Sequence, residues 1–173
     1  MGGRFSHGRE AGEPAVKWAC VSEPVTRQIR VRVPPARAFD AFVDVKDVLY
    51  WLADGAVIGR RAGGRWGLGW YADPDSDAGY HSIGVIETFE PAERFVVAGL
   101  VFSTPEGEEF GPMRLTVDFR EVDAGETLVT VTQEGMGDTA VWDGYQAGLG
   151  PGWERSLGDL KGWLEEGRKL PGR

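Results

Sequence analysis

The sequence predicts an α+β fold in which a curved antiparallel β-sheet of about six or seven strands wraps around a long C-terminal α-helix, with two short helices after the first strand. Three observations support this prediction: an amphipathic helical pattern at the end of the chain, a series of short alternating segments before it, and turn-forming residues between those segments. A sheet with one apolar face needs a cover on that face. The C-terminal helix is the only expected element long enough to supply it.

The first strand is expected at residues 26–33, where branched apolar side chains alternate with glutamine and arginine. A Pro-Pro pair ends this strand. The next two apolar patterns have helical spacing and predict the two short helices, at 36–43 and 44–53. Further strands are expected around 57–58 and then, in chain order, at 65–72, 80–90, 94–102, 113–122 and 127–134. Short connections between consecutive strands predict an antiparallel meander.

The C-terminal helix is expected at residues 151–166. Its apolar side chains recur at steps of four, three and four and therefore share one side of a helix: Trp153, Leu157, Leu160 and Leu164. Pro151 suits the first helical turn, and Gly167 suits a left-handed stop. Because glycines interrupt residues 138–150, we expect a bent or broken lid there rather than a continuation of the helix.

Composition narrows the class of protein. The chain has 173 residues, 42% of them hydrophobic and 27% charged, which suits a single domain. We expect this domain at 25–170, behind a partly flexible extension at 1–24. Residues 15–21 of the extension could add an edge strand. A net charge of −8 argues against a nucleic-acid partner. Cys20 is the only cysteine, so no internal disulfide can form, and we expect a reducing, cytoplasmic location. We find neither an apolar run of membrane-spanning length nor a hydrophobic signal core.

Four stretches of the chain occur in the order and spacing of a known fold. They are residues 35–42, the Gly63-Gly64-Arg65-Trp66 strand opening, residues 86–91 with Arg94 and Phe95 after them, and Gly152-Trp153 followed by Leu157, Leu160 and Leu164. Through them, residues 25–167 resemble the START/SRPBCC (helix-grip, birch-pollen-allergen-like) superfamily and, within it, the AHSA family of heat-shock protein 90 ATPase activator homologues. The resemblance implies a helix-grip fold but no single function, because the superfamily includes carriers of hydrophobic ligands, polyketide cyclases, lipid-transfer domains and chaperone-binding domains.

In a helix-grip fold, the second helix, the early strands and the C-terminal lid surround a cavity, and in this chain all three are rich in aromatic residues. Seven tryptophans exceed what a core needs, and an apolar pocket with a few polar groups is a typical ligand site. The residues expected to line the cavity are Tyr50, Trp51, Trp66, Leu68, Trp70, His81, Ile83, Val85, Met113, Leu115, Trp142, Tyr145, Leu149 and Trp153. Arg65, His81 or Tyr145 could fix the orientation of a ligand.

His81 and Glu87 share the strand parity of Ile83 and Val85. Facing inward, these two polar groups could orient a ligand or act as acid and base. The alternative, which we favour, leaves His81 in water at the strand end and pairs Glu87 with an arginine.

Sequence motifs give no support for a metal, a cofactor or a catalytic residue, and none is predicted. Two histidines are too few for a histidine-based metal site, and the acidic turn at 73–77 lacks the glycine and glutamate of a calcium-binding EF-hand loop. The Gly67-Leu-Gly69 stretch lies inside a strand rather than before a helix, which excludes a dinucleotide-binding turn. No nucleophile has an evident base partner.

The leading hypothesis is a protein that binds a small hydrophobic molecule, aromatic or lipid-like, between the sheet and the C-terminal helix. The second is a chaperone-binding module, as the resemblance implies, although the full co-chaperone also uses a separate N-terminal domain that 24 residues are too few to supply. The third is a cyclase-like or hydrolase-like enzyme using the same cavity. A homodimer stays open as a further alternative.

Overall fold

The computed structural model describes residues 21–173, so the expectations for residues 1–20, including most of the edge strand at 15–21, lie outside the described residues. Val21 forms an isolated antiparallel bridge with Gly137. The elements are, in chain order, β1 (Val25–Val31), α1 (Pro35–Val43), α2 (Val45–Trp51), β2 (Gly55–Ile58), β3 (Arg65–Tyr71), β4 (Gly79–Glu90), β5 (Arg94–Ser103), β6 (Glu109–Asp123), β7 (Glu126–Glu134), a 3₁₀ turn η1 (Ala140–Trp142) and α3 (Asp143–Glu166).

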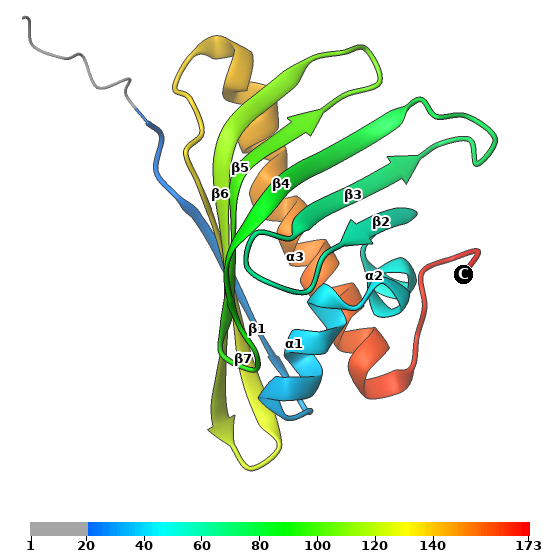
Figure 1. Cartoon of the computed structure of the whole chain (residues 1–173), viewed down its shortest axis with the longest axis vertical. Coiled ribbons are helices and arrows are strands. Elements are labelled where there is room, and N and C mark those ends of the chain that lie inside the picture. The colour runs from blue at the N-terminus through cyan, green and yellow to red at the C-terminus, as the bar shows by residue number, and fades with distance from the viewer. Residues whose placement is uncertain (1–20) are drawn as a thin grey trace, which may run out of the picture.

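Within residues 21–173, seven strands form one antiparallel sheet in the order β1-β7-β6-β5-β4-β3-β2. Strands β2 to β7 are a meander, and β1 pairs with β7 at the far edge. Figure 1 shows the sheet curving around α3, with α1 and α2 at one end of the groove. The α+β helix-grip architecture predicted from the sequence is therefore confirmed.

The core lies on the concave face of this sheet. Phe39 and Phe42 on α1 are fully buried, and their rings meet those of Phe95 and Phe119 at centroid distances of 5.3–6.0 Å, mostly edge-on. Edge-on packing of this kind is favoured by the quadrupoles of aromatic rings. The space beneath α1 is thus filled by the protein's own side chains.

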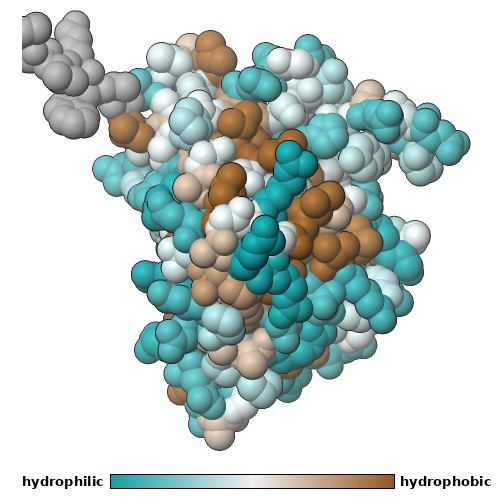
Figure 2. Space-filling view, in the orientation of Figure 1, coloured by the Kyte–Doolittle hydropathy of each residue, from teal (hydrophilic) through white to brown (hydrophobic). Residues whose placement is uncertain are grey.

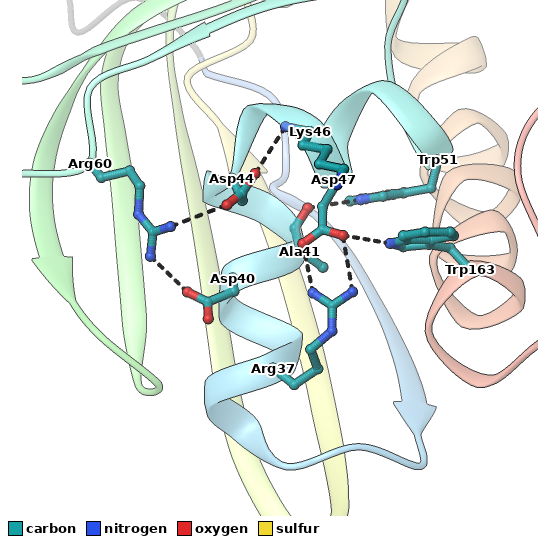
Figure 3. A network of polar contacts seen from close by, with 9 residues as sticks. All are labelled: Arg37, Asp40, Ala41, Asp44, Lys46, Asp47, Trp51, Arg60 and Trp163. Carbon is teal, nitrogen blue, oxygen red and sulfur yellow. Dashed lines mark hydrogen bonds and ion pairs between the residues drawn. The ribbon is translucent and has the colours of Figure 1, made fainter. Parts of the chain in front are cut away.

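The helices are tied together by a polar network around Asp47 (Figure 3). Arg37 on α1 donates two hydrogen bonds to the Asp47 carboxylate at 2.6 and 3.0 Å, and the indole N–H of Trp163 on α3 donates to it at 2.9 Å. Burial by itself would raise the pKa of Asp47, but these hydrogen bonds outweigh it and hold that pKa below its ordinary value. The indole of Trp51 donates to the carbonyl of Ala41 at 2.8 Å, which fixes α2 against α1.

Helix α3 differs from the prediction at its N-terminal half. It begins at Asp143 and continues without interruption to Glu166, so Pro151 lies inside the helix rather than in its first turn, and residues 143–150 are helical rather than a broken lid. A residue before proline usually avoids helical geometry because its Cβ meets the proline ring, and Gly150 has no Cβ. The predicted stop is confirmed: Gly167 adopts a left-handed conformation with φ of 67°.

Burial against the sheet offsets what proline costs the helix, since tertiary packing supplies most of the stability of a helix in a protein. Leu157 and Leu160 are buried, and Trp153 and Leu164 pack against the core, so the predicted apolar stripe is confirmed. No helix among residues 21–173 is both long and apolar enough to cross a membrane.

Candidate functional site

A pocket of about 400 Å³ lies between the concave face of the sheet and α3. Its walls come from the end of α2, from β3 to β7 and from the N-terminal half of α3: Leu52, Trp66, Leu68, Trp70, Ser82, Leu100, Phe102, Leu115, Gln133, Gly144, Tyr145, Gly148, Leu149, Gly152, Trp153, Arg155 and Ser156. Most of these side chains are aliphatic or aromatic. Figure 2 shows hydrophobic side chains reaching the middle of the visible face, with hydrophilic ones crossing between them. Size and lining are those of a typical small-molecule site.

Three glycines of α3 form part of the pocket wall. Gly144, Gly148 and Gly152 are spaced four residues apart and so share one face of the helix. A Cβ built at any of them would have no atom within 4 Å other than its two chain neighbours and the nearby backbone of its own helix. Each glycine inside a helix costs about 1 kcal/mol relative to alanine. Packing within the fold therefore does not require glycine at these three positions, and the absence of side chains there leaves space along the pocket wall.

The polar groups of the pocket meet at Gln133, an inward-facing residue at the end of β7 that is only 3% exposed. The indole N–H of Trp153 donates to its side-chain oxygen at 3.1 Å. Its amide nitrogen donates to the hydroxyl oxygen of Tyr145 at 2.7 Å and to the sulfur of Met113 at 3.3 Å. Both polar ends of this buried amide are therefore satisfied by side chains.

Burial raises the pKa of Tyr145 to about 12, although the hydrogen bond from Gln133 acts in the opposite direction. The hydroxyl is therefore neutral at physiological pH. Arg155, at the rim, is exposed and has no carboxylate within 4.0 Å among residues 21–173. The pocket thus offers hydrogen-bond donors and one cationic group at its edge.

The structure brings together part of the predicted lining. The predicted residues that border the pocket are Trp66, Leu68, Trp70, Leu115, Tyr145, Leu149 and Trp153. Trp66, Leu68 and Trp70 face it because the alternation of β3 places all three on the concave side.

Four predicted lining residues belong to the packing around the pocket rather than to its wall. Trp51 is buried against Phe42, and Tyr50 packs on Trp163, because α2 turns this pair toward α1 and the end of α3. Met113 and Trp142 lie behind the wall: the sulfur of Met113 contacts Gln133, and the ring of Trp142 packs edge-on against Phe110 and Tyr145.

His81, Ile83 and Val85 lie on the convex face, and their prediction as lining residues was wrong. Ile83 and Val85 are 48% and 52% exposed, and the ring of His81 packs against Tyr71. The cause is the register shift between Ile86 and Thr88, where β4 carries one residue more than β5, and this extra residue reverses the facing of side chains along β4. Phe89, beyond this shift, packs inward on Phe39 although it shares the parity of Ile83.

The favoured interpretation of Glu87 is confirmed, because its carboxylate pairs with Arg114. Arg65 is exposed at the start of β3 and does not border the pocket between the sheet and α3. Neither residue is therefore placed to orient a ligand inside it.

Sequence reasoning missed Gln133, although a signal was present. Val129 and Val131 face inward along β7, and Gln133 has the same parity. The alternation therefore predicts a polar side chain on the apolar face of the sheet. It also missed the other lining residues: Leu52, Ser82, Leu100, Phe102, Gly144, Gly148, Gly152, Arg155 and Ser156. Within residues 21–173, no group of three or more His, Cys, Asp or Glu side chains is placed to hold a metal ion.

Comparison with known proteins supports the architecture. The family model of Activator of Hsp90 ATPase homolog 1-like protein matches residues 32–165. No curated protein matches the chain. Among solved structures, protein SSP2350 from Staphylococcus saprophyticus is similar with a TM-score of 0.66 and 22% identity, over 87% of this chain and 98% of that one.

Two further structures extend the comparison. DynU16, described as a putative protein in the dynemicin biosynthetic locus, has a TM-score of 0.65 at 20% identity, and the match covers 86% of this chain but only 49% of DynU16. The Aha1 dimer from Colwellia psychrerythraea has a TM-score of 0.64 at 14% identity, over 84% of this chain and 98% of that one. At these identities the likeness concerns the fold alone.

Proposed function

Since this chain belongs to the Activator of Hsp90 ATPase homolog 1-like (AHSA) family of the START/SRPBCC superfamily, we propose that it binds a small hydrophobic molecule, aromatic or lipid-like, in the pocket between its sheet and α3. The observation that carries this proposal is the row of three glycines along the pocket, Gly144, Gly148 and Gly152. Alanine at these sites would meet no obstacle and would favour the helix. A ligand lying against this face of α3 supplies the reason for glycine.

Burial of apolar surface provides the affinity. Trp66, Trp70 and Trp153 offer flat aromatic walls, and each square ångström of apolar ligand surface removed from water contributes roughly 25 cal/mol. The cost of association and of ordering the ligand subtracts from this gain. A rigid ring system suits the pocket best, because it loses the least conformational freedom on binding.

Acid–base catalysis has less support than binding. Among the described lining residues, the ionisable side chains are Tyr145 and Arg155; burial raises the pKa of Tyr145 to about 12, and a guanidinium group has no acceptor for a proton. Neither can serve as a general base there. A chaperone interaction remains the alternative that the family name suggests, and stimulation of a purified chaperone ATPase by this protein would favour it.

The decisive experiment is a titration with N-phenyl-1-naphthylamine, a neutral apolar probe whose emission rises when it leaves water. We expect saturable one-to-one binding, with transfer of tryptophan excitation from Trp66, Trp70 and Trp153 to the probe. Native mass spectrometry of the purified protein should show an added small-molecule mass. A flat titration, together with a protein mass that matches the chain alone, contradicts the proposal.

A further inference from the structure

The hydrogen bonds around Gln133 determine which proton the pocket offers. An indole N–H can only donate, so the partner of Trp153 must be the side-chain oxygen of Gln133. The amide nitrogen then faces Tyr145 and Met113, and its two protons are used in those two contacts. This amide has no freedom to exchange its oxygen and nitrogen without leaving the indole N–H unpaired.

The hydroxyl group of Tyr145 consequently acts as an acceptor toward Gln133. Its own proton needs a different acceptor, and no side chain or carbonyl within residues 21–173 receives it. Tyr145 borders the pocket, between Gly144 and Gly148 on α3 and the ring of Phe102, which lies 5.3 Å away between centroids. The unused donor therefore belongs to the pocket and not to the packing behind it.

We propose that the ligand is an apolar ring system carrying a carbonyl-type oxygen, as in ketones and quinones, and that this oxygen accepts the hydroxyl proton of Tyr145. The inference rests on the proposed function and adds the chemical class of the ligand. It holds across the physiological pH range, because burial raises the pKa of Tyr145 to about 12 and keeps its proton in place.

A ligand without an acceptor would bind at a cost. It would bury the Tyr145 hydroxyl against apolar atoms with its proton unpaired, and an unpaired buried donor loses the whole of its hydration. No side chain or carbonyl of residues 21–173 accepts that proton instead. The pocket thus favours a hydrophobic ligand that carries one acceptor oxygen over a similar ligand that lacks it.

The test compares 9-fluorenone with fluorene, which share one tricyclic skeleton and differ in a ketone oxygen. Both are titrated by displacement of N-phenyl-1-naphthylamine from the full chain and from Tyr145→Phe, which removes only the hydroxyl. The ratio of fluorenone to fluorene affinity should be about five- to tenfold larger in the wild type than in the variant, as expected for one hydrogen bond. Fluorene serves as the internal control for any loss of packing.

Infrared spectroscopy of bound fluorenone gives a second readout that does not depend on the variant folding well. Its carbonyl stretch should lie at lower wavenumber in the wild-type protein than in cyclohexane. Equal affinity ratios in both proteins, or a carbonyl stretch at its cyclohexane position, overturn the inference while leaving the binding pocket intact. If none of the three compounds (the naphthylamine, fluorene and fluorenone) binds, the result contradicts the proposed function and this inference with it.

Discussion

The carboxylate of Asp47 on α2 accepts a hydrogen bond from the indole N–H of Trp163 on α3 at 2.9 Å while holding both arms of the Arg37 guanidinium (Figure 3). One side chain thus links the three helices at the closed end of the groove. The Asp47 side chain is 15% exposed, so solvent screens these contacts only in part. The attachment of α3 to the rest of the fold depends in part on this carboxylate.

Asp47→Asn should destabilise the protein by about 1–2 kcal/mol at pH 7, because it removes the charge that Arg37 and Trp163 share. The pKa of Asp47 is depressed in the folded protein, so its contribution is fully present above the unfolded value of 3.8 and is lost as pH falls through the folded pKa. Urea denaturation should therefore show the wild type and the variant converging at acidic pH. Asp77→Asn, an equal charge change in an exposed turn, is the control and should leave stability unchanged at pH 7.

The succession of elements along the chain and the C-terminal helix follow from local patterns, since alternation along Met113–Phe119 or a stripe from Trp153 to Leu164 needs no partner to be recognised. Two features could not be predicted in this way. The register shift between Ile86 and Thr88 arises from the pairing of β4 with β5, so a single parity carried from His81 to Phe89 was misleading. The start of α3 depends on burial against the sheet, which overrides the local preference of Pro151.

Gly148→Leu should reduce naphthylamine binding at least tenfold and should raise the free energy of unfolding. The new side chain would enter the space along the pocket wall, where nothing lies within 4 Å of the built Cβ, and leucine favours a helix over glycine by up to about 1 kcal/mol. Fluorescence titration and urea denaturation measure the two effects. Gly158→Leu is the matched control, since Gly158 also has open space on α3 but does not border the pocket. Equal binding by both variants would show that the probe sits elsewhere.

Arg155→Gln should weaken binding of 1-anilinonaphthalene-8-sulfonate by about two- to fivefold and leave the neutral N-phenyl-1-naphthylamine unaffected, because the two probes differ only in the sulfonate. Arg155 lies at the rim of the pocket and is exposed, so a single charge contact there contributes at most about 1 kcal/mol. The difference should shrink as salt is added. Arg120→Gln, at an exposed site outside the pocket, controls for the change in net charge. A similar loss for both probes would assign Arg155 a packing role instead.

Gly150→Ala should destabilise the protein by about 1 kcal/mol, whereas Gly158→Ala should stabilise it by roughly 0.5–1 kcal/mol through helix propensity alone. The added Cβ at Gly150 would meet the guanidinium of Arg27, which pairs with Glu154 at 2.7 Å, and it would also meet the ring of Pro151. Chemical denaturation of the two variants separates these positions. In an Arg27→Ala background, Gly150→Ala should cost less, because only the contact with proline remains. Should Gly150→Ala be as stable as Gly158→Ala, close approach of Arg27 to the helix would not be the reason for this glycine.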